Sequence, residues 1–260
     1  MDVMSNVPRP ARTPIRRPSW LRAPWLAATV LAAALLACGA TEVPSAPEPD
    51  ADLALLFIGN SLTYANGLPE IVEALLADAT GGTVVAQQVA LPNYGLEDHW
   101  REGTASAAIA RGGWDWVVMQ QGPSATEGRP SLLEYAHRFG LEATAVGARP
   151  ALYMVWPSRV RSFDFDGVAE SYAMAADSAD GVLFPAGDAW RAAWRRNPQL
   201  ALYDFDGFHP SVLGTWLAAL TIADRIVGGT LDPDFSGAPI PVGVGPLLLE
   251  AAREANAAWP

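Results

Sequence analysis

The stretch LLFIGNSLTYANGLPEIVEALL, residues 55–76, contains the change of pattern that decides the fold. It begins as a continuous apolar run, which is typical of a strand buried on both faces. The run stops at Gly59-Asn60-Ser61, and apolar residues then recur at helical spacing. A small polar residue between a strand and a helix is a common place to expose a nucleophile, but it is also an ordinary α/β connection. Ser61 therefore needs partners elsewhere in the chain before it indicates chemistry.

The same alternation of patterns continues through the chain. Short apolar runs rich in β-branched residues predict strands at 53–58, 83–90, 114–120, 151–156 and 182–185. Helical spacing predicts helices at 68–79, 105–111, 131–146, 168–176, 189–196, 210–227 and 246–258. Right-handed crossovers would arrange them as a three-layer α/β/α sandwich with a central five-stranded parallel sheet. Ligands bind beyond the carboxyl ends of the strands in such a sheet, so the residues that follow the strands should share one edge.

The charged residues exclude two kinds of chemistry. All 17 basic residues are Arg, so a Schiff-base or P-loop lysine is excluded. Residues 1–37 contain five of these Arg against a single acid, which leaves the rest of the chain with a net charge of about −15. Such an acidic body repels a phosphate backbone, and we therefore expect no nucleic-acid partner.

Residues 1–37 are predicted to be a signal peptide. Arg16, Arg17 and Arg22 precede an apolar run at 25–37, which is short for a membrane span and suits a signal-peptide core. The run leads to Cys38 through Leu-Leu-Ala, which resembles a bacterial lipobox, in which the cysteine is acylated. We expect a lipid anchor at Cys38; the alternative is an ordinary signal peptide that is cleaved nearby.

The remaining sequence divides into a tether and a domain. Residues 38–52 are rich in Pro, Ala and acid and are expected to form an extended tether, and residues 53–260 form the domain. Cys38 is the only cysteine, so the domain has no internal disulfide. The expected location is the bacterial cell envelope, with the outer membrane or surface favoured because Gly39 follows the cysteine. A periplasmic or secreted protein is the alternative.

Three histidines are available as a base for Ser61. His137 lies in a predicted amphipathic helix, where a satisfied surface or boundary histidine is expected. His209 follows an Asp206-Gly207 turn, and a carboxylate three residues away can hold one imidazole nitrogen while the other faces the serine. Pro210 is expected to open the next helix at its first position. A D-x-x-H pair alone is weak evidence, since it also occurs as a helix cap.

The order and spacing of four motifs resemble those of the SGNH (GDSL-type) hydrolases. They are the G-N-S-[LF]-T start at residues 59–63 and the segments LPNYGLEDHW (91–100), WDWVVMQQGPS (114–124) and LYDFDGFHPSVLGTWLAA (202–219). The resemblance is to a bacterial branch of this superfamily and extends over residues 53–229. It implies a flavodoxin-like fold and a carboxylic ester hydrolase that needs no metal or organic cofactor.

The resemblance also implies roles for individual residues. Ser61 would be the nucleophile, His209 its base and Asp206 the group that orients the imidazole. The N–H groups of Ser61 and Gly95 and the side-chain amide of Gln121 would form the oxyanion hole. The sequence departs from the family pattern in two places. Asn60 replaces the usual acid before the serine, and the usual oxyanion asparagine has no obvious counterpart. Gln120 and Ser124 are alternatives to Gln121.

The substrate is less well specified. His99 either lines the pocket beside Trp100 or is a helix-start histidine bonded to Glu97 or Asp98. Eight tryptophans follow Cys38, and those near strand or helix ends (Trp100, Trp156 and Trp190) could stack on sugar rings, whereas Trp114 and Trp116 suit the core. We expect a short-acyl or acetyl ester of a carbohydrate.

Three other functions are compatible with the sequence. An O-acyltransferase would use the same triad with a sugar hydroxyl as acceptor instead of water. A non-catalytic surface lipoprotein could bind glycans in the same pocket, although the intact Ser-His-Asp set argues against it. A metal site could in principle use five residues, although their spacing is not that of a compact metal cluster: Asp98, His99, Asp204, Asp206 and His209.

Overall fold

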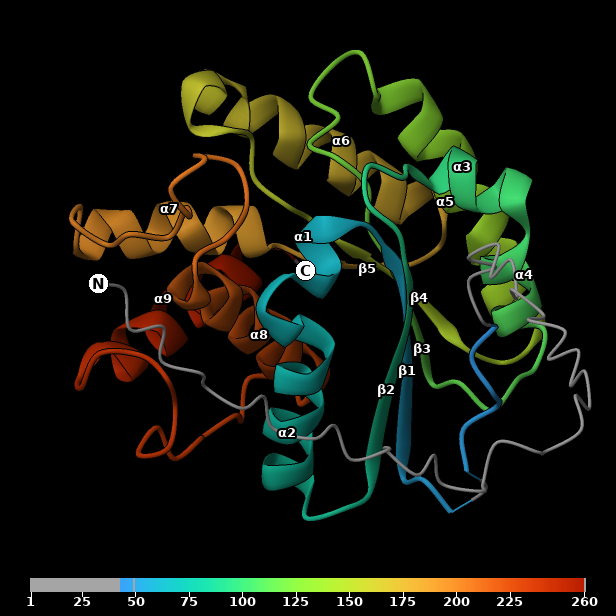
Figure 1. The fold of residues 1–260 in the computed structure, drawn as a ribbon, viewed down its shortest axis with the longest axis horizontal. Helices are drawn as coiled ribbons and strands as arrows, with labels where there is room; N and C mark the ends of the chain where they lie inside the picture. The colour runs from blue at the N-terminus through green and yellow to red at the C-terminus, as the bar shows by residue number, and fades with distance from the viewer. Residues whose placement is uncertain (1–42, 49, 260) are drawn as a thin grey trace, which may run out of the picture. The chain divides into compact units, whose positions relative to one another are not determined.

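The computed structural model describes residues 43–48 and 50–259 (Figure 1). The predicted signal peptide and Cys38 lie outside these residues. The described residues of the predicted tether contain neither helix nor strand, and the first strand begins at Leu53. Within the described residues, none of the helices has both the length and the apolar character to cross a membrane.

A five-stranded sheet forms the centre of the domain, as predicted. Its strands are β1 (Leu53–Gly59), β2 (Val84–Ala90), β3 (Trp116–Met119), β4 (Arg149–Tyr153) and β5 (Val182–Phe184). Their order is β2-β1-β3-β4-β5, and every neighbouring pair is parallel. Residues 54–59 of β1 are all buried, as expected for a strand that helices cover on both faces.

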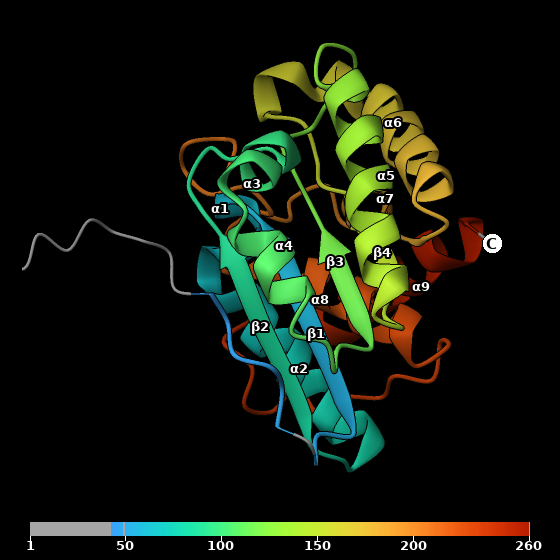
Figure 2. The same cartoon turned by 90° about the vertical axis from the view of Figure 1, so that its right-hand side faces the viewer.

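Helices cover both faces of the sheet, which confirms the three-layer sandwich. The helices are α1 (Ser61–Tyr64), α2 (Leu68–Thr80), α3 (Leu96–Glu102), α4 (Thr104–Ile109), α5 (Arg129–Ala145), α6 (Phe165–Ser178), α7 (Ala186–Arg196), α8 (Val212–Ile226) and α9 (Val244–Ala258), with short 3-10 turns η1 (Ala65–Gly67) and η2 (Arg159–Asp164). α2, α7, α8 and α9 pack together on one side of the sheet, and α3 to α6 pack on the other. Figure 2 shows α3, α4 and α5 in front of the strands.

Most element boundaries differ from the prediction by a few residues, and the short helices α1 and α3 were not predicted. Two of the differences have identifiable reasons. The fourth strand ends at Tyr153 and not at Trp156, because its neighbour β5 is only three residues long and ends opposite Tyr153. α8 begins at Val212, after the N-cap Ser211, whose hydroxyl accepts the Gly214 N–H at 3.1 Å. Pro210 therefore does not open this helix. It instead forms an isolated antiparallel bridge with Tyr203.

The stretch 55–76 folds as strand, short helix, turn and long helix. α1 ends at Tyr64 because Ala65 leaves the helical conformation (ψ 133°). Asn66 (φ 54°) and Gly67 (φ 70°) then adopt left-handed conformations that separate α1 from α2. Asn and Gly are the residues that adopt this conformation most readily. Ser61 thus lies at the first position of α1, at the carboxyl end of β1. The residues that follow β2, β3 and β4 meet it at the same edge of the sheet.

Candidate active site

A chain of hydrogen bonds joins three of the predicted residues at this edge. His209 Nε2 lies 2.9 Å from Ser61 Oγ, and His209 Nδ1 lies 2.5 Å from Asp206 Oδ2. Ser61 comes from the end of β1 and His209 from the segment before α8, 148 residues later. Because a carboxylate only accepts, Nδ1 carries the proton of the neutral ring and Nε2 is free to accept from the serine hydroxyl.

Residues 203–210, which we call the histidine loop, are organised by local bonds. Asp206 Oδ1 accepts the N–H groups of Phe208 and His209, both at 2.9 Å. The Asp204 N–H donates to the His209 carbonyl at 2.8 Å and closes the loop on itself. The hydrogen bond from His209, followed by that from the Phe208 N–H, lowers the pKa of Asp206. The carboxylate therefore stays charged and keeps the imidazole in the required tautomer.

Residues 59–63, which we call the serine segment, are held by buried contacts from other elements. Gln120 Oε1 accepts the Asn60 N–H at 3.0 Å and the Thr63 hydroxyl at 2.9 Å. A Cβ on Gly59 would lie 2.2 Å from Thr63 Oγ1 and 2.6 Å from Gln120 Oε1, so only glycine fits there. Gln120 thus supports the serine from beneath, and it is not available as an oxyanion donor.

Asn60, which stands where the family has an acid, caps α1 and also makes a bond that an acid could not make. Its Oδ1 accepts the Leu62 N–H at 3.0 Å and caps α1. Its Nδ2 donates to the Tyr94 carbonyl at 2.9 Å. A carboxylate has no such proton. The amide therefore ties the serine segment to the loop that carries Gly95.

His99 fits neither of its two predicted roles. It is fully buried in α3, and its Nε2 donates to the Gly59 carbonyl at 2.7 Å, with no bond to Glu97 or Asp98. Burial lowers its pKa below the usual 6.5, so the ring is neutral. Its Nδ1 is buried and has no hydrogen-bond partner in the described residues. The sequence missed this role because nothing local indicates that α3 packs beneath the end of β1.

Two of the three predicted oxyanion donors are engaged elsewhere. The Gly95 N–H donates to Asp98 Oδ2 at 2.8 Å, in a capping box at the start of α3. Gln121 Oε1 accepts the Leu96 N–H at 3.1 Å, and its Nε2 donates to Ser124 Oγ at 2.8 Å and to the Gly128 carbonyl at 3.2 Å. The Ser61 N–H, at the first position of α1, has no partner within its helix.

The Ser124 hydroxyl is also engaged. It donates to the Gly122 carbonyl at 2.9 Å while it accepts from Gln121. Of the three side chains proposed for the last oxyanion donor, Gln121 is the one that lines the cavity at Ser61.

Asn66 is a contributor that the sequence did not reveal. Its Nδ2 donates to the Pro210 carbonyl and to Thr215 Oγ1, both at 2.9 Å. Pro210 directly follows His209, so this side chain links the region beside Ser61 to the region beside the histidine. The Asn66-Gly67 pair predicts a turn, but its contact lies 144 residues away and has no sequence signal.

A scan against models of protein families finds no match, and no curated protein matches the sequence. Solved structures do match. A protein from Slackia heliotrinireducens that is assigned to the SGNH hydrolases is 30% identical over 66% of this chain and 97% of that one, with a TM-score of 0.56. This chain belongs to the SGNH hydrolases. It is accordingly a hydrolase of ester bonds, and the predicted family and enzyme class are confirmed.

More distant structures share the fold of this SGNH hydrolase. A DUF4886 family protein from Bacteroides uniformis has a TM-score of 0.58 at 17% identity, over 79% of this chain and 93% of its own. An acetyl xylan esterase from Geobacillus stearothermophilus has a TM-score of 0.57 at 15% identity, over 71% and 98%. These dissimilar sequences therefore adopt the same layered α/β/α fold.

A cavity of about 340 Å³ opens at Ser61 in the SGNH hydrolase. Its walls come from the segments after β1, β2 and β3 together with Phe208 of the histidine loop. The lining residues are Asn60, Ser61, Asn93, Tyr94, Gly95, Glu97, Asp98, Gln121, Gly122, Gly128, Ser131 and Phe208. Two carboxylates lie in this wall and no basic side chain does, so the cavity favours uncharged over anionic groups.

The tryptophans expected at the pocket lie elsewhere. Trp156 and Trp190 are fully buried and stack on one another at 3.6 Å between ring centroids. Trp100 packs against Phe139 of α5 at 5.2 Å and does not line the cavity at Ser61. The prediction of Trp100 as a pocket residue is therefore wrong, and the Trp content no longer argues for a sugar.

The other predictions for this region have clear outcomes. His137 is an exposed residue of α5 whose Nδ1 bonds the Ser178 carbonyl at 2.7 Å, as expected for a satisfied surface histidine. In residues 43–48 and 50–259, no three His, Cys, Asp or Glu side chains come together in a way that could hold a metal ion.

Proposed function

We propose that this SGNH hydrolase is a serine esterase that cleaves small, short-acyl carboxylic esters through Ser61, His209 and Asp206. The observation that carries the proposal is the continuous hydrogen-bonded chain from Ser61 Oγ through the imidazole to Asp206. This is the arrangement that serine hydrolysis requires: a nucleophile, a base within hydrogen-bond reach of it and a group that orients the base.

The geometry suits a two-step reaction. His209 Nε2 removes the Ser61 proton as Oγ attacks the ester carbonyl, and the charge on Asp206 stabilises the imidazolium that forms. The same nitrogen then gives its proton to the departing alcohol oxygen. A water molecule takes the place of the alcohol, loses a proton to His209 Nε2 and attacks the acyl carbonyl. The bond to Ser61 Oγ then breaks, and His209 returns the proton to Oγ as the acid leaves.

The oxyanion would be held by the N–H groups of Ser61 and Gly95 and by the Gln121 amide. The first of these is unengaged within α1. The Gly95 N–H becomes available when the exposed Asp98 side chain turns away from it. Gln121 Nε2 becomes available when its longer hydrogen bond, to the Gly128 carbonyl, is replaced by one to the oxyanion. Each such donor contributes on the order of 3 kcal/mol to the transition state, or about a hundredfold in rate.

The size and charge of the cavity support the short-acyl substrate. The cavity at Ser61 has a volume of about 340 Å³ and must hold the ester carbonyl together with its acyl chain, so it leaves little room for a long chain. Glu97 and Asp98 in its wall disfavour anionic acyl groups. An acetyl xylan esterase shares the fold, which is consistent with an acetyl ester of a carbohydrate.

Hydrolysis of p-nitrophenyl esters from acetate to octanoate by the full-length chain tests this proposal. We expect turnover that falls as the acyl chain lengthens, and a loss of about 10⁴-fold or more in Ser61→Ala. Ser106→Ala, on α4 and away from the cavity, is the matched control and should retain activity. Equal turnover by Ser61→Ala and the parent chain would refute the proposal.

A further inference from the structure

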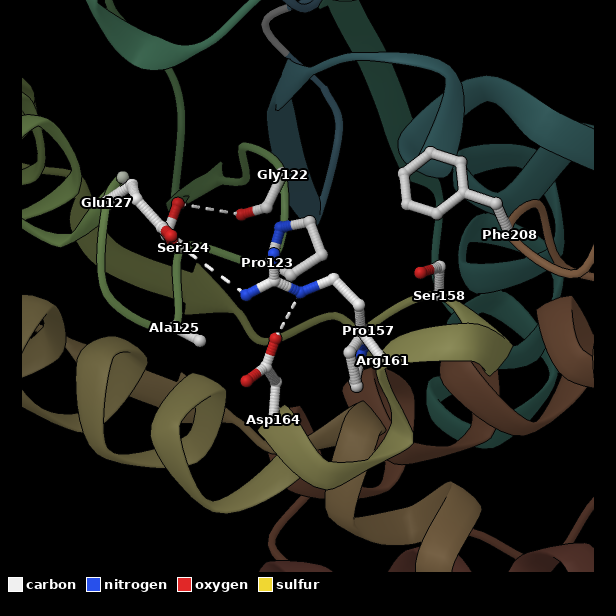
Figure 3. Close-up of a pocket in the computed structure, with 11 residues that line it drawn as sticks. Gly122, Pro123, Ser124, Ala125, Glu127, Pro157, Ser158, Arg161, Asp164 and Phe208 are labelled. Carbon is white, nitrogen blue, oxygen red and sulfur yellow. Dashed lines mark hydrogen bonds and ion pairs between the residues drawn. The ribbon is translucent and has the colours of Figure 1, made fainter.

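A second cavity, of about 380 Å³, shares part of its lining with the one at Ser61. Figure 3 shows side chains that line this second cavity. It is formed by the loop that follows β3 and by the segment from the end of β4 to η2. We call it the Arg161 cavity. Its lining residues are Gly122, Pro123, Ser124, Ala125, Glu127, Gly128, Pro157, Ser158, Arg161, Asp164 and Phe208. The sequence offered Ser124 of this wall as a site residue, but no sequence pattern indicated Ser158, Arg161 or Asp164.

The two cavities adjoin on the histidine side of the site. Both are lined by Gly122, Gly128 and Phe208. Phe208 immediately precedes His209, and their rings contact edge to face at 5.2 Å. The wall of the Arg161 cavity is also fastened to the histidine loop, since the N–H of Arg159 donates to the Gly207 carbonyl at 2.7 Å.

The chemistry of ester cleavage decides which half of the substrate faces this side. The alcohol oxygen must lie within hydrogen-bond reach of His209 Nε2, because it takes its proton from there. The carbonyl oxygen must instead face the Ser61 and Gly95 amides. A substituent on the alcohol oxygen therefore extends past Phe208 into the Arg161 cavity.

The charges in the Arg161 cavity exclude an anion as its occupant. Arg161 Nε bonds Asp164 Oδ2 at 2.5 Å, and its guanidinium lies 4.0 Å from the Glu127 carboxylate. The single positive charge is thus already compensated by two carboxylates. A phosphate or carboxylate ligand would gain little from Arg161 and would be repelled by both acids.

The remaining groups suit a ring that carries hydroxyl groups. The Ser158 hydroxyl has no hydrogen-bond partner in the described part of the chain and lines the cavity. The carboxylates of Glu127 and Asp164 can accept from hydroxyl groups, and Arg161 can donate to them. The ring of Phe208 offers an apolar face between the two cavities.

We propose that the Arg161 cavity binds the alcohol half of the ester and that this half is a neutral sugar unit. The inference rests on the proposed function, since it assigns the leaving group of that reaction. The polar groups of this cavity, and not the buried tryptophans, are therefore the structural argument for a carbohydrate substrate.

The test compares two acetate esters on the full-length chain. One is p-nitrophenyl acetate, whose flat leaving group has no hydroxyl, and the other is an acetylated xylo-oligosaccharide. Ser158→Ala and Arg161→Gln should lower kcat/KM for the sugar ester about tenfold more than for p-nitrophenyl acetate, mainly through KM. Arg195→Gln is the matched control, because it also removes an exposed Arg that is paired with an acid, and it should leave the ratio of the two activities unchanged.

The outcomes separate this inference from the function on which it rests. Turnover of p-nitrophenyl acetate without any turnover of the sugar ester would overturn the inference and leave the esterase standing. Equal losses on both esters in Ser158→Ala and Arg161→Gln would do the same. A chain whose activity on both esters does not depend on Ser61 would overturn the esterase and the inference together.

Discussion

The two segments that bring the triad together are built in opposite ways. The serine segment is almost wholly buried and is held by two side chains: Gln120, which directly follows β3, and His99 of α3. The histidine loop lies at the surface, with 38% of the His209 side chain and 37% of the Asp206 side chain exposed. Its internal bonds join residues no more than five positions apart.

This difference means that one segment contributes mainly to the stability of the fold and the other mainly to catalysis. The nucleophile is placed by the same buried contacts that hold the sheet together, so the loss of one of these contacts should destabilise the protein. The base and its carboxylate are held against each other by a local turn, so breaking that pair should stop the reaction and leave the fold intact. Four substitutions test this comparison, from the largest expected effect to the smallest.

Asp206→Asn should lower kcat/KM by about 10³- to 10⁴-fold and change the free energy of unfolding by less than about 1 kcal/mol. The amide can still accept the Phe208 and His209 N–H groups, but it would donate to His209 Nδ1 and place the ring proton on the nitrogen that faces Ser61. Asp204→Asn, in the same loop but without contact to the imidazole, is the control. Ester hydrolysis and urea unfolding measure the two effects, and a large loss of stability would contradict the comparison.

Gly59→Ala should destabilise the protein by about 3 kcal/mol, because its Cβ would collide with Thr63 and Gln120. Gly237→Ala, where a Cβ meets no atom within 4 Å, should change stability by less than about 0.5 kcal/mol. Urea unfolding of both variants measures the difference. If Gly59→Ala were as stable as Gly237→Ala, the serine segment would not be part of the packed core.

Asn66→Gly should lower kcat about tenfold while the protein stays folded. It removes both bonds that link the Ser61 side of the site to Pro210 and Thr215, and a small displacement of His209 is enough to cost that much. Asp180→Gly replaces another non-glycine residue with positive φ, far along the chain, and controls for the change in backbone freedom. Unchanged kcat in Asn66→Gly would show that the two segments hold their positions independently.

His99→Gln should reduce the loss of stability between pH 7.5 and 5.5 by about 1 kcal/mol. Burial lowers the pKa of His99, so below the usual 6.5 the unfolded chain takes up a proton that the folded chain does not. Stability therefore falls as the pH falls through this window. Glutamine can keep the donor to the Gly59 carbonyl but does not titrate.

Urea unfolding at the two pH values measures the slope of stability with pH. His137→Gln, on the surface of α5, serves as the control and should keep the slope of the parent chain. An identical slope in His99→Gln would mean that His99 is not the group responsible.

The sequence by itself determined the order of the strands and of every helix except the short α1 and α3, because the change of hydrophobic period is a local property of the chain. It also determined the Asp206-His209 pair, since three residues in a tight turn can meet without help from the rest of the molecule. Both predictions succeeded because they depend only on residues that are close together in the sequence.

Only the tertiary structure decided which side chains face the cavity. Adjacent residues at a strand end point in opposite directions, so Gln120 supports the serine segment while Gln121 lies at the cavity, and no pattern distinguishes them beforehand. The same holds for His99 and Trp156, whose burial depends on helices that pack against them from elsewhere in the chain. Periodicity fixes which face of an element is apolar, but contacts between distant segments fix what that face meets, and the site is made of such contacts.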